Sequence, residues 1–187
     1  MSRLFLVKHA LPEIAPDVPA KLWQLGEAGR AQSEGLAERL FPYHPGVVIT
    51  SKEPKAAETG GIVAQRLELP CATALGLHEQ DITGMPYFEN PEAFEEAVRS
   101  LFAEPDKRAY GNESADEALR RFEDALVRAL EPYPDKDVVI VTHGRVGTLF
   151  VAAYNPVKPF TFWKDWKLST FALLSRPDYK LLNPPNP

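Results

Sequence analysis

The sequence predicts an α/β fold of three layers, with helices on both faces of a mostly parallel central sheet. Buried strands are expected where short apolar runs occur, at 3–8, 46–50 and 137–142. Longer segments with helical spacing of apolar residues follow these runs, at 27–41, 54–67 and 145–154. Strands that alternate with helices in this way are typical of a parallel sheet covered on both faces.

The first half of the chain gives further detail. The helix at 27–41 ends before a proline, and the helix at 54–67 begins with one, which suits a first helical turn. Gly60 and Gly61 lie inside the second helix, where each costs about 1 kcal/mol relative to alanine. This cost predicts close packing of the helix on the sheet. A short strand is expected at 72–77.

An insertion at 78–113 interrupts the alternation. It is acidic, aromatic and broken by glycine and prolines, with one short helix expected at 91–103. It follows a strand, on the side where α/β proteins place binding loops, so we expect an inserted cap over the site. Regular structure resumes at Ser114, which with Glu117 matches a capping box before a long helix. Two last strands are expected at 159–163 and 167–174.

Composition narrows the class of protein. An apolar content of 44% over 187 residues is enough for the core of a single domain, 1–187. The net charge of −5 argues against nucleic-acid binding through phosphate neutralisation. No run approaches the roughly 18–20 apolar residues of a membrane span, and no signal peptide is recognisable, so we expect no membrane association and a cytoplasmic location. The single cysteine, Cys71, excludes an internal disulfide and is expected to be half-buried.

Two histidines stand at the ends of two predicted buried strands. His9 closes the run at 3–8, and His143 closes the run at 137–142. A polar imidazole at the end of a buried strand lies where open α/β sheets do their chemistry. Lys8 precedes the first histidine, and Gly144 follows the second at a strand-to-helix turn, where backbone N–H groups favour an anion.

Two further segments are expected to bring charge to the same edge of the sheet. Ser51 ends the second strand, and Lys55 lies in the first turn of the next helix. Positive charge is unfavourable at a helix N-terminus unless an anion binds nearby. Glu79 lies in a short acidic segment at the start of the insertion. The expected cluster therefore contains two histidines, two lysines and one carboxylate.

Two chemical interpretations compete for this cluster. In one, His9, His143 and Glu79 bind a divalent metal, as two histidines and a carboxylate can. Lys8 and Lys55 would then place positive charge against that cation. In the other, the cluster binds a phosphoryl group, for which lysines, imidazoles and a helix N-terminus are all suited. The second interpretation fits every charge, and it is the one we prefer.

These motifs resemble, in order, those of the histidine phosphatase superfamily, the phosphoglycerate-mutase-like proteins. The family pattern reads Arg-His-Gly at the first strand, then Ser-x-x-x-Arg-Ala-x-x-Thr, Leu-x-Glu, Gly-Gly-Glu-Ser before a long helix, and a late Thr-His-Gly. The matching residues here are Lys8-His9-Ala10, then Ser51, Lys55, Ala56 and Thr59, then Leu77-His78-Glu79, Gly111-Asn112-Glu113-Ser114 and Thr142-His143-Gly144.

The resemblance implies a phosphomonoesterase that needs no metal or other cofactor. His9 would attack phosphorus and become a transient phosphohistidine. Glu79 would protonate the leaving alkoxide and later accept a proton from the attacking water. The expected substrate is a phosphorylated small molecule or a phosphoprotein. The residues expected to bind its phosphoryl oxygens are Lys8, Ser51, Lys55, His143 and Gly144.

Departures from the family pattern keep alternatives open. Lysines replace both arginines, and an ammonium is a point charge where a guanidinium is a planar fork. Ala10 replaces the glycine, and Pro12 and Ala15 stand where the mutases have threonine and asparagine, which argues against phosphoglycerate mutase activity. A family member that binds phosphorylated ligands or a partner without turnover remains the main alternative.

Three assignments concern the surroundings of the cluster. Arg145 is expected on the surface rather than at the rim of the site. The stretch from Trp163 to Trp166 favours either a homodimer contact or a packed loop. Tyr87, Phe88 and Phe94 of the insertion are expected either to set substrate specificity or to pack in the core.

Overall fold

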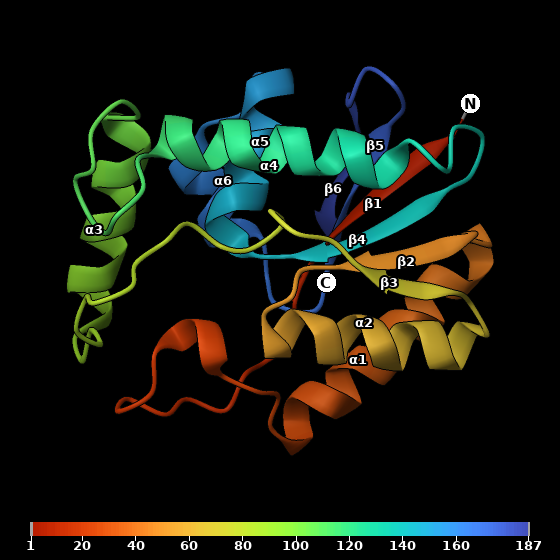
Figure 1. Cartoon of the computed structure of the whole chain (residues 1–187), viewed down its shortest axis with the longest axis horizontal. Coiled ribbons are helices and arrows are strands. Elements are labelled where there is room, and N and C mark those ends of the chain that lie inside the picture. The colour runs from red at the N-terminus through yellow and green to blue at the C-terminus, as the bar shows by residue number, and fades with distance from the viewer. Residues whose placement is uncertain (1, 187) are drawn as a thin grey trace.

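The computed structural model describes residues 2–186 and contains a mixed sheet with helices on both faces (Figure 1). Met1 and Pro187, the ends of the expected domain, lie outside the described residues. The strand order is β3-β2-β4-β1-β5-β6, in which the first four strands pair in parallel and β5 pairs antiparallel with both β1 and β6. The strands are β1 (Arg3–Lys8), β2 (Val47–Thr50), β3 (Cys71–Thr73), β4 (Val138–Thr142), β5 (Phe171–Ser175) and β6 (Leu181–Asn186). The predicted three-layer, mostly parallel α/β fold is confirmed.

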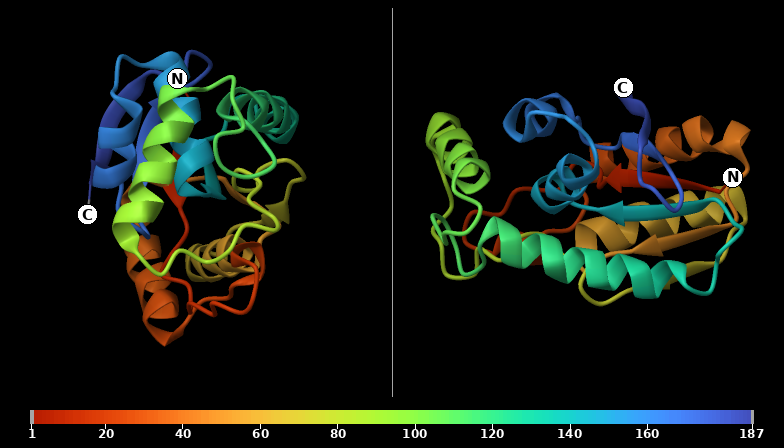
Figure 2. Two further views of the ribbon diagram at one scale, coloured as in Figure 1. Left: turned by 90° about the vertical axis from the view of Figure 1, so that its left-hand side faces the viewer. Right: turned by 90° about the horizontal axis from the view of Figure 1, so that it is seen from above.

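The helices form the two outer layers (Figure 1). One face of the sheet is covered by α1 (Glu27–Leu40) and α2 (Pro54–Leu67). The opposite face is covered by α4 (Ala115–Leu130), α5 (Gly144–Tyr154) and α6 (Pro159–Asp165). The remaining helix, α3 (Pro91–Ala103), stands beyond one end of the sheet (Figure 2). Short 3₁₀ helices lie at Ala20–Leu22 and Phe41–Tyr43.

The alternation of side chains along the strands creates one apolar core on each face. Leu4 and Leu6 of β1 pack with α4 and α5, whereas Phe5 and Val7 pack with α1 and α2. All four are fully buried, as expected for a central strand of a sheet covered on both sides. Within residues 2–186, no helix has both the length and the apolar character needed to cross a membrane.

The two adjacent glycines of α2 behave differently. A Cβ on Gly60 would lie 2.2 Å from Cγ2 of Thr50 in β2, so this glycine allows the helix to touch the sheet. A Cβ on Gly61 would meet no heavy atom within 4 Å. The next residue along a helix is rotated by about 100°, which turns Gly61 to the solvent side. The prediction of close packing is confirmed for Gly60 and wrong for Gly61.

The least accurate expectations concern β3 and the last third of the chain. The strand expected at 72–77 covers only Cys71–Thr73, because the chain turns at Gly76 with φ of 89°, and Cys71 is exposed rather than half-buried. The strand expected at 159–163 is wrong: α6 begins there with a proline in its first turn, and Phe162 and Trp166, four residues apart, both enter the core. The strand expected at 167–174 begins only at Phe171, after Ser169 adopts a left-handed φ of 56°.

The register of the parallel strands positions the candidate site. Lys8 lies opposite Thr142, and Thr50 lies opposite Val141. The chain therefore leaves β1, β4 and β2 at nearly the same level, at the carboxyl edge of the sheet. The arrowheads of these strands point toward α3 (Figure 2, right). The insertion thus lies at the edge where the predicted site residues emerge.

Candidate active site

The two strand-end histidines meet at the carboxyl edge of the sheet. The centroids of the His9 and His143 rings are 5.2 Å apart. His9 is 8% exposed and His143 is fully buried. Two imidazoles that are far apart in the sequence are therefore side by side, as the strand-end pattern predicts.

The environment of His9 leaves one ring nitrogen available. Its Nδ1 donates a hydrogen bond to the carbonyl oxygen of Ala10 at 2.8 Å, since a carbonyl can only accept. The Ala10 N–H in turn donates to Oγ1 of Thr59 at 3.0 Å, which fixes this turn of the backbone. Burial, together with the proximity of His143 and Lys55, holds the pKa of His9 well below 6.5. The ring is neutral at pH 7, and Nε2 carries an unprotonated lone pair.

His143 has one satisfied and one unsatisfied nitrogen. Its Nε2 shares a hydrogen bond of 2.9 Å with Oγ of Ser51. Its Nδ1 is buried and has no hydrogen-bond partner among the described residues. Burial, and then the charge of Lys55, hold the pKa of His143 well below 6.5. A buried polar atom without a partner is costly and is a natural contact for a ligand.

The side chain of Lys8 extends toward Gly144, the residue that follows His143. Its Nζ donates to the carbonyl oxygen of Trp166 at 2.8 Å and lies 5.8 Å from the centroid of the Trp163 ring. A Cβ on Gly144 would lie 3.2 Å from this Nζ, so a glycine there leaves room for the ammonium. Burial, only partly offset by the negative charge of Glu79, lowers the pKa of Lys8 to about 8.

Lys55 is buried and paired with a carboxylate that the sequence analysis did not anticipate. Its Nζ lies 2.5 Å from Oε2 of Glu53 and donates to the carbonyl oxygen of Ala20 at 2.8 Å. Lys55 is 6% exposed and Glu53 is 9% exposed. The anion that Lys55 requires at this helix N-terminus is thus supplied by its own chain. The signal in the sequence was an acid at the N-cap of the same helix, two residues before the lysine.

The side chain of Glu79 is bound at the N-terminus of α5. Its carboxylate accepts backbone hydrogen bonds from Gln80 and Val146 at Oε1 and from Arg145 at Oε2, at 2.9–3.0 Å. Burial raises the pKa of Glu79, but the charge of Arg145, the nearby His143 and these N–H groups outweigh it and bring the pKa to about 2. The anion that the sequence predicts at this helix N-terminus is therefore the Glu79 carboxylate.

The expectation that Arg145 lies on the surface is wrong. Its side chain is 6% exposed, because the start of α5 is packed beneath aromatic residues of the insertion. Nη1 donates to the hydroxyl of Tyr110 at 3.1 Å, and the guanidinium carbon lies 5.5 Å and 5.8 Å from the rings of Tyr110 and Phe94. Nε is 3.8 Å from Oε2 of Glu79 and has no hydrogen-bond partner. The site thus contains a guanidinium, although not at either position of the family pattern.

The insertion packs against the site through aromatic contacts. Phe94 lies 5.8 Å from Trp163, and Phe88 lies 5.6 Å from Tyr110, measured between ring centroids. Phe88 and Phe94 are half-buried, whereas Tyr87 is 41% exposed and stands 6.0 Å from Trp23. These contacts connect the insertion to the residues around Lys8 and Arg145.

Among the described residues, the structure gives no support to a metal site in this cluster. Within residues 2–186, no group of three histidine, cysteine or acidic side chains could hold a metal ion, so the metal-binding alternative lacks a ligand set there.

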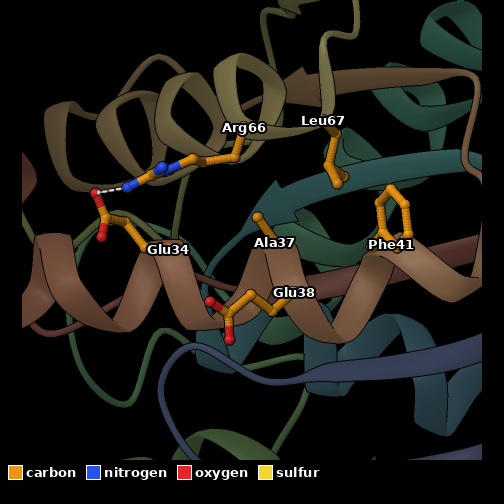
Figure 3. A pocket seen from close by; sticks show the side chains of 6 residues that line it. All are labelled: Glu34, Ala37, Glu38, Phe41, Arg66 and Leu67. Carbon is orange, nitrogen blue, oxygen red and sulfur yellow. Dashed lines mark ion pairs between the residues drawn. The ribbon is translucent and has the colours of Figure 1, made fainter.

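A groove between α1 and α2 lies near the Glu34–Arg66 ion pair of 2.7 Å (Figure 3). It also contains Leu67, which is about 18 Å along α2 from Lys55. The groove is therefore remote from the histidines.

Comparison with known families agrees with this geometry. Residues 13–176 match the histidine phosphatase superfamily (branch 1). The chain belongs to this superfamily. The matched stretch begins after His9, so the first motif, which departs from the family pattern at Lys8 and Ala10, lies outside it.

Individual histidine phosphatase relatives are distant. The chain is 33% identical over 132 residues to phosphoglycerate mutase-like protein 4 of Arabidopsis thaliana, a match that covers 66% of this chain and 56% of the relative. The chain spans less than three-fifths of the length of the curated relatives it matches.

Solved structures of phosphatases share the fold. A mycobacterial glucosyl-3-phosphoglycerate phosphatase superposes with a TM-score of 0.73 at 20% identity, over 92% of this chain and 89% of the other. The alpha-ribazole phosphatase of Shigella flexneri superposes with a TM-score of 0.74 at 18% identity, over 99% and 96%. At these identities the likeness concerns the fold.

Proposed function

We propose that the chain is a metal-independent phosphatase that hydrolyses phosphomonoesters through a phosphohistidine intermediate on His9. The observation that carries this proposal is the state of the His9 ring. Its Nδ1 is held by the Ala10 carbonyl and its pKa is depressed, so Nε2 is an unprotonated nucleophile at neutral pH. The His143 ring lies 5.2 Å from the His9 ring, centroid to centroid, and its unpartnered Nδ1 is suited to contact a phosphoryl oxygen.

The proposed reaction has two steps. In the first, a bond forms between Nε2 of His9 and phosphorus while the ester P–O bond breaks, and the leaving oxygen receives a proton through Glu79, which must first acquire that proton because its pKa is about 2. In the second, water attacks phosphorus, the N–P bond breaks, and Glu79 accepts a proton from that water. Lys8, Lys55 and the Nδ1 side of His143 stabilise the phosphoryl oxygens as their charge changes. Ser51 and Gly144 support this arrangement, by orienting His143 and by leaving space for Lys8.

Hydrolysis of 4-nitrophenyl phosphate in the presence of a chelator tests the proposal. We expect activity in the wild type and its loss in His9→Asn, with radioactive phosphate from a labelled substrate retained on the wild-type protein after rapid denaturation. His44→Asn is the matched control: His44 is exposed and has a left-handed φ of 52°, which asparagine tolerates. Full activity in His9→Asn would exclude the phosphohistidine mechanism.

A second candidate function is phosphate binding without turnover. It is favoured by Glu79, whose two carboxylate oxygens accept three backbone hydrogen bonds and whose pKa of about 2 leaves it without a proton at neutral pH. The same assay separates the two functions. A protein that binds phosphate at this site but releases no nitrophenol, and retains no phosphate on His9, is a binding protein.

A further inference from the structure

The charges around the histidines differ from those that the family pattern implies. The pattern places two arginines and one acid at the site. Here the buried or half-buried charged groups are three cations, Lys8, Lys55 and Arg145, and two carboxylates, Glu53 and Glu79. Neither the family pattern nor the proposed reaction has a role for Arg145 or for Glu53, and of these two Glu53 is the anion.

Glu53 contacts several residues of the site. Oε2 contacts Lys55 at 2.5 Å, and Oε1 accepts a hydrogen bond from the N–H of Glu79 at 2.9 Å. Oε1 also lies 3.7 Å from Nε2 of His143. The backbone N–H of Glu53 donates to Oγ of Ser51 at 3.2 Å. Its carboxylate therefore lies against the same lysine and histidine that are proposed to bind the phosphoryl group.

The pairing of charges leaves a single cation for a ligand. Glu53 is paired with Lys55, and Glu79 lies 3.8 Å from the Nε of Arg145. Among residues 2–186, Lys8 forms no ion pair within 4 Å. The cluster thus has one net positive charge. A doubly charged phosphoryl group would leave the site with one net negative charge, an unfavourable balance where solvation is poor, whereas a singly charged group would be neutralised.

We propose that Glu53 acts as an internal anion that makes the site select a singly charged phosphoryl group over a doubly charged one. The ligand class is a phosphomonoester in its singly protonated form, and this assignment rests on the proposed function. The proton on such a phosphoryl group also completes the reaction. It passes to the ionised Glu79 and from there to the leaving oxygen as the P–O bond breaks, so that no external acid is required.

Binding of two inert tetrahedral anions tests the selection without turnover. Sulfate carries two negative charges and perrhenate carries one. We expect the wild type to bind perrhenate at least as tightly as sulfate, measured by titration of the imidazole NMR signals of His9 and His143. In Glu53→Gln the sulfate dissociation constant is expected to fall roughly tenfold or more, and that of perrhenate by a smaller factor. The single amide oxygen of glutamine can replace only one of the two carboxylate oxygens, so the variant keeps either the contact with Lys55 or the hydrogen bond from the Glu79 N–H.

Glu58→Gln is the matched control, because Glu58 lies on the same helix and pairs with Arg30 rather than with the site. It is expected to leave the affinities for both anions unchanged. Tighter sulfate than perrhenate binding in the wild type would overturn the proposal even if Glu53→Gln failed to fold. An unchanged sulfate affinity in a folded Glu53→Gln protein would also overturn it. Failure of the proposed function is a separate result, because it appears as absent hydrolysis whatever the anion preference.

Discussion

Arg121 of α4 holds the segment that contains Glu79, and its replacement tests how that segment is positioned. The guanidinium donates to the carbonyl oxygens of Gly76, His78 and Glu79 at 2.6–3.2 Å. It also forms a bidentate pair with Glu113, with both N···O distances 2.7 Å. Every donor atom of this side chain is thereby used. Arg121→Met keeps the apolar stem and removes all five hydrogen bonds.

The expected cost follows from burial. The Arg121 and Glu113 side chains are 20% and 14% exposed, so removal of one partner leaves a mostly buried carboxylate without its cation. Breaking a fully buried pair costs about 3–5 kcal/mol, and with partial exposure we expect a loss of about 3 kcal/mol in the free energy of unfolding. Urea denaturation followed by tryptophan fluorescence measures it, with the exposed Arg120→Met as control, expected within about 0.5 kcal/mol of wild type. A loss under about 1 kcal/mol for Arg121→Met would refute the assigned role.

Three further outcomes are expected. Gly60→Ala should lower stability by about 1–3 kcal/mol, because the new Cβ would lie 2.2 Å from Cγ2 of Thr50, whereas Gly61→Ala should raise it by about 0.5–1 kcal/mol; thermal unfolding compares the two. Perrhenate affinity should fall as pH rises through about 8, where Lys8 loses its proton, and Lys8→Arg should remove that fall in a binding titration. Glu79 has a folded-state pKa of about 2, so its ionisation should add stability above pH 4.5 that is lost toward pH 2, and Glu79→Gln should flatten the stability curve over that range.

The parts of the fold that were predictable are those fixed by local pattern. Central strands such as β1 and β4 are apolar except at their ends, because both faces are covered. The start of α4 is predictable from the Ser114–Glu117 capping box. The error at α6 has a physical cause. A short segment rich in aromatic residues fits a strand or a helix equally well by composition, and tertiary packing of Phe162 and Trp166 decides between them.

The predictable part of the site is the part set by strand ends. His9, His143 and Ser51 follow three parallel strands in matching register, so their proximity is a consequence of topology. The pairing of charges was not predictable in the same way. Whether Lys55 faces a ligand or Glu53 depends on side-chain direction in one helical turn, and the burial of Arg145 depends on how the insertion packs over α5.

The replacement of arginine by lysine at positions 8 and 55 is best understood together with these carboxylates. An ammonium is a compact charge, and Lys55 uses two of its three N–H donors on Glu53 and the Ala20 carbonyl. A guanidinium at the same place has five donors and would keep more of them free for a phosphoryl group when paired with Glu53. Arg145 shows the other case: it lies beside Glu79 and still has a buried Nε without a partner. The capacity of this site for anions is therefore governed as much by the placement of its two carboxylates as by the number of its cations.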